Sequence, residues 1–337
     1  MERKCAQMGT LLEGKVAVVT GSGQGVGRAV ALELARQGAR VVTNNRKPGA
    51  NRDGAGMITA EMRTHMQEGD RQWLEARYAD HGGDAETTAA AIRAEGGQAV
   101  SFFGDISDFD TAGQLIQTAV DTFGSVDILA NIAGGFGFSP IESLPPDLWE
   151  RVTAVKPKGY YNTIRHAVPH MLEKGWGRII NCTSRAFLGD VIKHAEYCAA
   201  NAGVVGLTRA VAIELWGRGV TCNAFSPFAR TRASVDLEMY GKASGGQTPW
   251  TDPKFSVSYE GTPMPEQVAP FICYLATPAA EKISGTVFEL AGNKIGRYSE
   301  PEVVRSVVKE GEPWSVEELV EKAPRLLFQG YRSIADK

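Results

Sequence analysis

A glycine-rich segment near the start of the chain has residues that could hold a nucleotide phosphate. The segment TGSGQGVG follows a short apolar run and opens a helical pattern. Glycines let the backbone turn tightly and approach a pyrophosphate, and the helix N-terminus adds free N–H groups and positive potential. In this context the segment predicts a dinucleotide site, with a plain helix cap as the alternative. The predicted contacts are Gly21, Ser22, Gly23, Gln24, Gly25, Val26 and Gly27.

The residues after the second apolar run indicate which nucleotide fits. An acidic residue there would accept hydrogen bonds from a ribose 2′-hydroxyl and would repel a 2′-phosphate. Here Asn44 and Asn45 are followed by Arg46 and Lys47. Because arginine can bind a phosphate through two N–H groups, the sequence favours NADP(H) over NAD(H), with Asn45 and Arg46 as contacts. The alternative is that Arg46 is a solvated loop charge.

Short apolar runs alternate with helical patterns and would position these segments. The runs predict strands buried on both faces at Lys15–Thr20, Arg40–Thr43, Val100–Phe103, Val126–Ala130, Arg178–Cys182, Val220–Phe225 and Thr286–Leu290. The intervening patterns predict helices at Arg28–Gln37, Asp84–Ala94, Thr111–Phe123, Leu148–Leu172 and Ala195–Trp216. The alternation predicts an α/β fold: a single Rossmann-type, doubly wound parallel sheet with helices on both faces.

Three stretches interrupt this alternation and suggest the domain organisation. We expect a flexible N-terminus at 1–10, a Rossmann-fold domain at 11–296 and a C-terminal extension at 297–337. The domain contains a long insertion after the second strand, 48–83, with a predicted helix at Met57–Tyr78. It also contains a polar and aromatic loop, 232–260, with no clear period. In the extension, Ser315 begins a typical helix start. Segments this long in a compact domain are usually functional loops or interface arms.

Composition narrows the class of protein. The chain has 337 residues, a formal charge of −3 and a pI of about 6.0, which do not suit a nucleic-acid-binding protein. It contains no apolar run long enough to span a membrane, and because MERKCAQMGT lacks an apolar stretch we expect no secretory signal. The five cysteines are scattered, without C-x-x-C spacing, so neither a disulfide framework nor a metal site is predicted. A reducing, cytoplasmic location fits best.

Several motifs in order resemble those of the short-chain dehydrogenase/reductase family. The resemblance covers Leu12 to Gly296, and the tail VFELAGNKIGRYSEP is similar to the hydroxyacyl-CoA dehydrogenase branch of multifunctional β-oxidation enzymes. After the glycine-rich turn, the matching features are Asp105-Ile106, Asn131-Ile132-Ala133-Gly134, the strand ending at Ser184, Tyr197 thirteen residues later, and the loop carrying Pro227 and Thr231. The resemblance implies that the cofactor contacts include Asp105, Ile106, Asn131, Ala133, Gly134, Tyr197, Asn201, Pro227 and Thr231.

The resemblance implies hydride transfer between nicotinamide and a carbonyl or alcohol carbon. Tyr197 would give or take the hydroxyl proton, and Ser184 would bind the substrate oxygen. Two other positions of the catalytic group depart from the family pattern. The lysine expected four residues after the tyrosine is Asn201, and the asparagine expected in the preceding long helix is Lys156. The two residue types are thus exchanged, and one cation is kept.

We hypothesise that Lys156 supplies the positive charge that Asn201 cannot. An ammonium about 4 Å from a phenolate, at an effective dielectric constant of 20, is worth roughly 4 kcal/mol. That would lower a tyrosine pKa by up to about three units before desolvation acts against it. The alternative is that Lys156 points into solvent and the site is weak or inactive. Lys193 and His194, just before Tyr197, are expected to be exposed loop charges, although a histidine could carry protons.

Aromatic residues on predicted loops above the carboxyl ends of the strands are candidates for substrate contact. They are Phe136, Phe138, Phe187, Phe228, Tyr240 and Trp250. Such a set suits a bulky substrate with a ring system or an acyl chain. Arg63, Arg71 and Arg77 on the insertion could match the phosphates of coenzyme A. In the resembled family the two long helices form a homo-oligomer interface, which implies a dimer or tetramer here.

The sequence therefore predicts an NADPH-dependent oxidoreductase that interconverts a ketone and a secondary alcohol, with unusual acid–base residues. Two alternatives belong to other classes. One is a catalytically silent subunit that uses the fold as a scaffold, and the other is an NADP(H)-binding regulatory protein. The presence of both Ser184 and Tyr197 favours the enzyme, since a silent copy has no physical need for either.

Overall fold

The chain divides into two units, one ending at Arg297 and the other beginning at Tyr298. The computed structural model describes residues 10–49, 58, 60–243 and 258–334. The predicted substrate contact Trp250 lies outside these residues. The other candidate site residues belong to the first unit, which we describe first.

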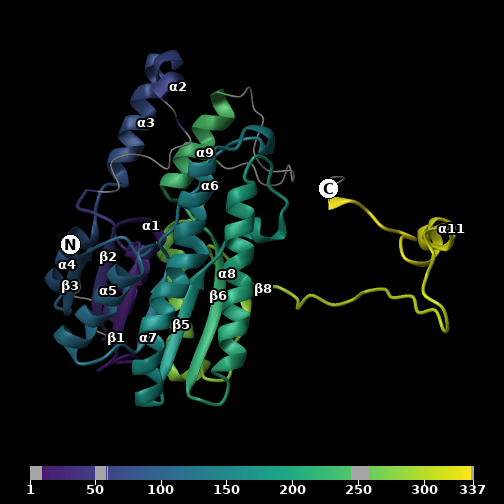
Figure 1. Cartoon of the computed structure of the whole chain (residues 1–337). Helices are drawn as coiled ribbons and strands as arrows, with labels where there is room; N and C mark the ends of the chain where they lie inside the picture. Colours follow the sequence, from purple (N-terminus) through teal and green to yellow (C-terminus); the bar gives the residue numbers. More distant parts are fainter. Residues whose placement is uncertain (1–9, 50–57, 59, 244–257, 335–337) are drawn as a thin grey trace. The chain divides into compact units, whose positions relative to one another are not determined.

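An eight-stranded sheet forms the centre of the first unit (Figure 1). The order is β3-β2-β1-β4-β5-β6-β7-β8, and all pairs are parallel except β7 with β8. The order reverses between β1 and β4, which is where open sheets bind ligands. The strands are β1 (Val16–Thr20), β2 (Arg40–Asn45), β3 (Ala99–Phe103), β4 (Ile128–Asn131), β5 (Gly177–Cys182), β6 (Val220–Phe228), β7 (Val287–Ala291) and β8 (Lys294–Arg297). The predicted doubly wound sheet is confirmed, and only β8, at its edge, was not predicted.

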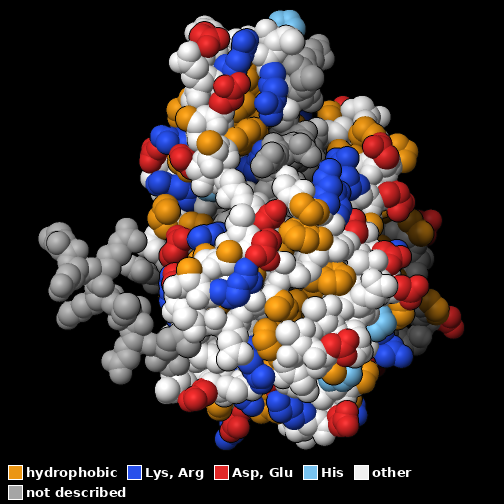
Figure 2. Space-filling model, turned by 90° about the vertical axis from the view of Figure 1, so that its left-hand side faces the viewer, with side chains coloured by type: hydrophobic (Ala, Val, Ile, Leu, Met, Phe, Trp, Pro, Cys, Tyr) orange, Lys and Arg blue, Asp and Glu red, His pale blue; other side chains and the backbone are white. Residues whose placement is uncertain are grey.

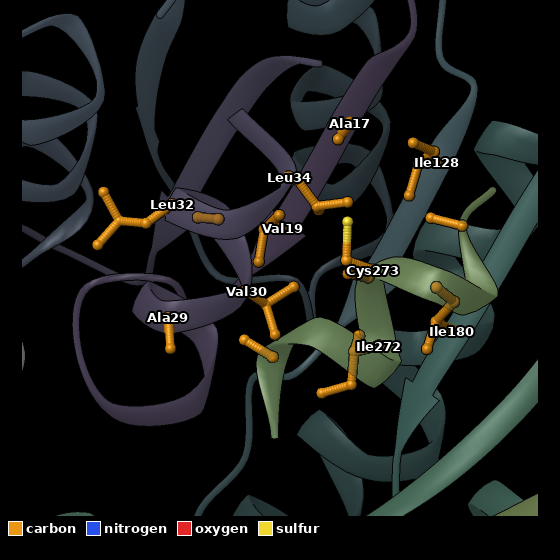
Figure 3. Packing of buried hydrophobic residues seen from close by; sticks show 14 of the residues in the cluster. Ala17, Val19, Ala29, Val30, Leu32, Leu34, Ile128, Ile180, Ile272 and Cys273 are labelled. Carbon is orange, nitrogen blue, oxygen red and sulfur yellow. The ribbon is translucent and has the colours of Figure 1, made fainter. Parts of the chain in front are cut away.

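Helices cover both faces of the sheet and bury an apolar cluster on each. On one face α1, α4 and α10 pack against Ala17 and Val19 of β1, and Figure 3 shows part of this packing. On the other face α5, α7 and α8 pack against Val16 and Val18. Successive strand residues point to opposite faces, which explains why β1 is apolar throughout. The helices are α1 (Gly25–Arg36), α4 (Ala85–Ala94), α5 (Phe109–Phe123), α7 (Tyr160–Lys174), α8 (Ala195–Glu214) and α10 (Ala269–Leu275).

The region Leu148–Leu172, predicted to be one helix, is broken near its centre. A widened turn at Ala154–Gly159 separates α6 (Pro146–Thr153) from α7, and Lys156 within it has φ −126° and ψ 124°. The cause is Pro157, because a proline ring clashes with a helical conformation of the preceding residue. The prediction of a continuous helix is therefore wrong. The break carries the Lys156 side chain to the protein interior, where it is 3% exposed.

The insertion after β2 forms two helices, α2 (Ala60–His65) and α3 (Glu68–Asp80), in place of the single helix predicted at Met57–Tyr78. Helix α3 packs against α9 (Arg232–Ala243), which lies in the stretch predicted to have no regular structure. A small apolar core joins the insertion to α9 and the following loop. Its buried members are Ile58, Leu74, Val235, Met239 and Tyr259.

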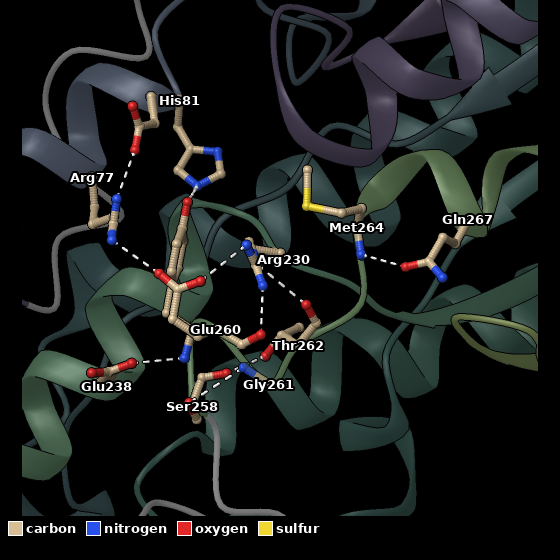
Figure 4. Close-up of polar contacts among 12 residues, drawn as sticks. Arg77, His81, Arg230, Glu238, Ser258, Glu260, Gly261, Thr262, Met264 and Gln267 are labelled. Carbon is tan, nitrogen blue, oxygen red and sulfur yellow. Dashed lines mark hydrogen bonds and ion pairs between the residues drawn. The ribbon is translucent and has the colours of Figure 1, made fainter.

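Ion pairs also connect the insertion to neighbouring loops (Figure 4). Arg77 lies 2.9 Å from Glu260 and 3.2 Å from Asp80, and Arg230 at the end of β6 lies 3.4 Å from Glu260. Glu260 is 62% exposed, so these pairs contribute little free energy and the apolar core dominates the attachment. Of the other arginines considered for coenzyme A, Arg71 pairs with Glu68 and Arg63 lies over the Tyr78 ring.

The second unit contains one helix among its described residues, α11 (Val316–Leu326). Ser315 caps it: its hydroxyl accepts the N–H of Glu318 at 3.1 Å, and the Glu318 carboxylate accepts the N–H of Ser315 at 3.0 Å. This reciprocal cap satisfies two backbone donors at the start of the helix. The helix start predicted at Ser315 is confirmed.

Candidate active site

The glycine-rich turn between β1 and α1 lines a cavity of about 590 Å³. Gly21 has φ +64°, and a Cβ on it would lie 2.7 Å from Cα of Ala133, on the loop after β4. Both the left-handed backbone and the close approach require glycine. The lining extends from this turn and the end of β2 to Lys156 and Tyr197.

The cavity brings most of the predicted cofactor contacts together. Ser22 and Asn131 are not in its lining and instead support its walls. The hydroxyl of Ser22 accepts the N–H of Asn44 at 2.8 Å, and the amide of Asn131 bonds to Asn181 and Thr163. Gly23 and the fully buried Asn201 are also absent from the lining. The predicted contacts that line it are Gly21, Gln24, Gly25, Val26, Gly27, Asn45, Arg46, Asp105, Ile106, Ala133, Gly134, Tyr197, Pro227 and Thr231.

Polar atoms in this cavity fit a dinucleotide. Gln24 Oε1 and Asn45 Oδ1 are buried, and neither has a hydrogen-bond partner among the described residues. Buried polar atoms rarely stay without a partner, so these two indicate a polar ligand. The N-terminus of α1 offers its free N–H groups to a pyrophosphate, while Asn45 and the exposed Arg46 lie where an adenosine ribose would bind.

Ser184 and Tyr197 lie together at the carboxyl end of β5. Ser184 begins a short 3-10 turn, η4 (Arg185–Leu188), and Tyr197 lies in the first turn of α8. Both line a second cavity of about 180 Å³, which shares Tyr197, Phe136 and Pro227 with the first. The two cavities therefore meet at Tyr197, as a hydride transfer between a cofactor and a substrate would require.

Lys156 and Asn201 form a buried pair next to Tyr197. The amine Nζ of Lys156 donates to the carbonyl oxygen of Cys182 at 2.7 Å and to Oδ1 of Asn201 at 3.4 Å. Asn201, one helical turn after Tyr197, donates from Nδ2 to the carbonyl oxygen of Tyr197 at 2.8 Å. Gly134 leaves room for the lysine, because a Cβ there would lie 2.7 Å from Cε. The alternative in which Lys156 points into solvent does not hold.

Burial controls the acid–base properties of Tyr197 and Lys156. It raises the pKa of Tyr197 to about 12, against the opposing effect of hydrogen bonds with Ser184 and Asn201. It lowers the pKa of Lys156. Both shifts have the same cause, since the charged form of each group loses its hydration. Tyr197 therefore keeps its proton at neutral pH, whereas Lys156 releases its proton more readily than an exposed lysine.

The substrate candidates divide into two groups. Phe136 and Phe228 line the second cavity. Phe138 and Tyr240 pack on each other with ring centroids 4.0 Å apart, and neither they nor Phe187 line either cavity in the described part of the chain. The wall is completed by Ala233, Ser234 and Leu237 of α9, which sequence reasoning missed because this stretch has no apolar period.

The residues just before Tyr197 differ from expectation. Lys193 is exposed, as predicted, but the prediction that His194 is an exposed loop charge is wrong. His194 is 3% exposed, lines the second cavity and lies against Phe136 and Phe138. Glu196 is fully buried and is a site residue that the sequence alone did not indicate. The only signal in the sequence is that an acidic residue directly precedes Tyr197.

Comparison with known proteins identifies the family. A family model described as short chain dehydrogenase matches residues 15–73 and 54–236. The chain belongs to this family. It is 31% identical to the hydroxyacyl-CoA dehydrogenase ChsB1 of Mycobacterium tuberculosis over 318 residues, which covers 92% of this chain and 87% of that protein. It is 32% identical to a 3-oxoacyl-[acyl-carrier-protein] reductase of Synechocystis, with 85% of this chain and 99% of the relative covered.

A solved structure agrees. A crystal structure of a short chain dehydrogenase from Mycobacterium avium superimposes with a TM-score of 0.71 and 31% identity, covering 94% of this chain and 96% of the other. A versicolorin reductase of Emericella nidulans is 29% identical over 297 residues, 83% of this chain and 96% of the relative. The broad expectations of a family oxidoreductase that acts between ketone and alcohol with a nicotinamide cofactor are confirmed.

The helices and the surface charges of the described residues bear on whether the partner is a membrane or a nucleic acid. Among the residues that the structure describes, no helix has both the length and the apolar character to cross a bilayer. On the face seen in Figure 2, basic and acidic side chains are interspersed. This face therefore differs from the continuous basic surfaces that bind nucleic acid.

Proposed function

We propose that the protein is an NADP(H)-dependent oxidoreductase that interconverts a ketone and a secondary alcohol on a bulky acyl or ring-bearing substrate. The observation that carries this proposal is the convergence of Ser184, Tyr197 and the buried Lys156–Asn201 pair where the two cavities meet. A silent scaffold or a regulatory protein needs no such arrangement.

The relatives support this substrate class. ChsB1 is named for a hydroxyacyl-CoA, and the Synechocystis protein for a 3-oxoacyl group on a carrier protein. The Emericella protein is named for versicolorin. The second cavity has apolar walls at Phe136, Val191, Phe228 and Leu237, which suit an apolar substrate body.

The cofactor preference rests on the end of β2. Asn45, the last residue of β2, is not acidic, and Arg46 lines the cavity. A guanidinium there can pair with a 2′-phosphate, and no carboxylate at the strand end repels it. This supports NADP(H) over NAD(H).

The side chains divide the acid–base work. The bound nicotinamide supplies the hydride for the carbonyl carbon. In the reductive direction the Ser184 hydroxyl donates a hydrogen bond to the substrate oxygen, and Tyr197 transfers its proton to that oxygen. Lys156, buried and hydrogen-bonded to Asn201, provides the positive charge that favours the deprotonated form of Tyr197. Reversing these steps oxidises the alcohol.

We also propose a cytoplasmic location and a homodimer or homotetramer built through α7 and α8. The four described cysteines, Cys182, Cys198, Cys222 and Cys273, are free thiols, which suits a reducing compartment. Large apolar side chains near the end of α8, Ile213 and Trp216, are exposed in the single chain, as interface residues would be.

NADPH consumption with a panel of acyl and cyclic ketones tests the function. We expect turnover by the native chain and a loss of about 10² to 10⁴ in kcat for Tyr197→Phe, which keeps the ring but removes the proton. Fluorescence titration of NADPH is the control and should show that the Tyr197→Phe protein still binds the cofactor. Binding without turnover of any ketone would contradict the enzyme and favour the regulatory protein, and failure to bind NADPH would favour the scaffold.

A further inference from the structure

Two buried polar side chains at the start of α8 have no assigned role. His194 is 3% exposed and Glu196 is fully buried. His194 Nδ1 lies 3.9 Å from Oε1 of Glu196, and that oxygen accepts the N–H of Gly137 at 3.1 Å. His194 Nδ1 and Glu196 Oε2 have no hydrogen-bond partner among the described residues. Buried polar atoms without a partner are rare, and His194 lines the substrate cavity.

The surroundings fix the histidine ring in one orientation. Its centroid lies 5.8 Å from that of Phe136 and 5.0 Å from that of Phe138, both nearly edge to face. With Nδ1 buried toward Glu196, Nε2 is the ring nitrogen left for the cavity. Such a carboxylate–histidine arrangement sets the direction in which the outer nitrogen points.

Glu196 is held as a carboxylate despite its burial. Burial pushes the pKa of Glu196 upward, but the nearby His194 ring and the backbone N–H groups of Glu196 and Gly137 outweigh that effect and hold the pKa below its ordinary value. The other charged groups nearby are engaged elsewhere: Lys193 lies over the Phe138 ring, and Arg185 pairs with Asp190 at 2.6 Å. Of these three side chains, His194 is therefore the one that lies beside the Glu196 carboxylate.

We infer that His194, oriented by Glu196, binds a second oxygen of the substrate, next to the reacting carbonyl. This inference rests on the proposed function and narrows it to 3-oxoacyl and 3-hydroxyacyl compounds. Ser184 and Tyr197 bind the reacting oxygen, and His194 lies in the same small cavity with its ring centroid 6.1 Å from that of Tyr197. One substrate can touch both rings. A ring with its hydrogen on Nε2 donates to the carbonyl oxygen of a thioester, ester or carboxylate.

The geometry also separates the roles of the two residues. His194 contacts the substrate and determines specificity. Glu196 does not line the cavity and is a positioning residue, which acts through the ring. Replacing His194 by phenylalanine keeps a ring between Phe136 and Phe138 but removes the donor. Replacing it by glutamine returns an N–H group near the position of Nε2.

Calorimetric titration of the enzyme–NADP⁺ complex tests the inference without requiring turnover. The probes are ethyl 3-oxobutanoate and 2-heptanone, which have chains of equal length and differ in the ester group. We expect the native complex to bind the ester about tenfold more tightly, as suits one additional hydrogen bond. His194→Phe should bring the ratio of the two dissociation constants to about one, and His194→Gln should restore part of it.

Lys193→Gln is the matched control, because this neighbouring side chain is exposed, and it should preserve the ratio. Glu196→Gln should reduce it through loss of ring orientation. A native ratio near one, or a His194→Phe complex that still prefers the ester, would overturn the inference even if ketones are turned over. A preserved preference for the ester with no turnover of any ketone would leave the inference standing and refute the proposed oxidoreductase.

Discussion

At the residue scale, the active centre keeps a lysine but takes it from a different segment of the chain, the break between α6 and α7. Asn201 occupies the position one turn after Tyr197, and Lys156 reaches it from the broken segment between α6 and α7. The lysine contacts Cys182 and Asn201, and the Asn201 amide in turn donates to the backbone carbonyl of Tyr197. Burial of both titratable groups makes this connection important, because an isolated buried phenolate is strongly disfavoured.

Arg46 gives a residue-scale prediction about the cofactor. We expect Arg46→Ala to raise the KM for NADPH about tenfold and to leave the KM for NADH nearly unchanged, since only NADPH carries the 2′-phosphate that the guanidinium would bind. Steady-state kinetics with both cofactors measure this. Lys47→Ala removes a neighbouring exposed charge and should have a smaller effect. An equal rise in KM for both cofactors would show that Arg46 does not bind the 2′-phosphate.

Residues whose type is required by the local backbone conformation were predictable from the sequence. The glycine at position 21 is one, because its turn and its approach to Ala133 need glycine. The burial of His194 was not predictable, since it depends on Phe136 and Phe138, which come from a loop more than fifty residues earlier in the chain. When distant segments bury a residue, the sequence around that residue does not show it.

At the element scale, the break between α6 and α7 is what delivers Lys156 to the site. The apolar spacing of this region predicts one helix, yet Pro157 forces Lys156 out of the helical conformation. The proline was visible in the sequence and outweighs the periodicity. α9 was missed for the opposite reason: its apolar residues face the insertion core as well as the cavity, so no single apolar stripe appears.

Pro157→Ala tests the role of this break. Without the proline ring, the backbone of Lys156 can become helical, and the side chain should leave Asn201. We expect kcat to fall toward that of Lys156→Ala, while the thermal unfolding temperature changes little. The matched control is Pro169→Ala, at an exposed position inside α7, which should leave kcat unchanged. Full activity of Pro157→Ala would show that the break does not position Lys156.

At the scale of the whole molecule, the sheet order was predictable because buried strands alternate regularly with helices. The insertion and α9 add a layer over the site, held by the core around Leu74 and Tyr259. The antiparallel edge strand β8 (Lys294–Arg297) was not predictable, because the strand is short and most of its residues are exposed. Its pairing with β7 follows from the tight connection between them.

Assembly is a prediction for the whole molecule. Ile213 is 78% exposed and Trp216 is 63% exposed, which is costly for large apolar side chains in a lone chain. We expect light scattering to give two or four times the 36.2 kDa of one chain, and Trp216→Glu to lower that mass. Ile141→Glu, at another exposed apolar position, is the control and should not. A native protein that stays monomeric at micromolar concentration would contradict the proposal.

The central claim is that Lys156 performs the task of the absent lysine, and the pH dependence of kcat for Lys156→Ala tests it most directly. Alcohol oxidation needs Tyr197 without its proton, so its rate rises with pH until the pKa in the working complex is passed. A positive charge lowers that pKa, and its removal should move the rise to higher pH.

We therefore predict that Lys156→Ala lowers kcat at pH 7 about 100-fold and shifts this rise upward. NADPH binding and thermal unfolding, measured alongside, show whether the variant is folded and still holds the cofactor. Combining Lys156→Asn with Asn201→Lys returns the cation from the other side and should recover part of the loss. If Lys156→Ala keeps the native kcat and pH profile, the lysine plays no part in the chemistry and the account is contradicted.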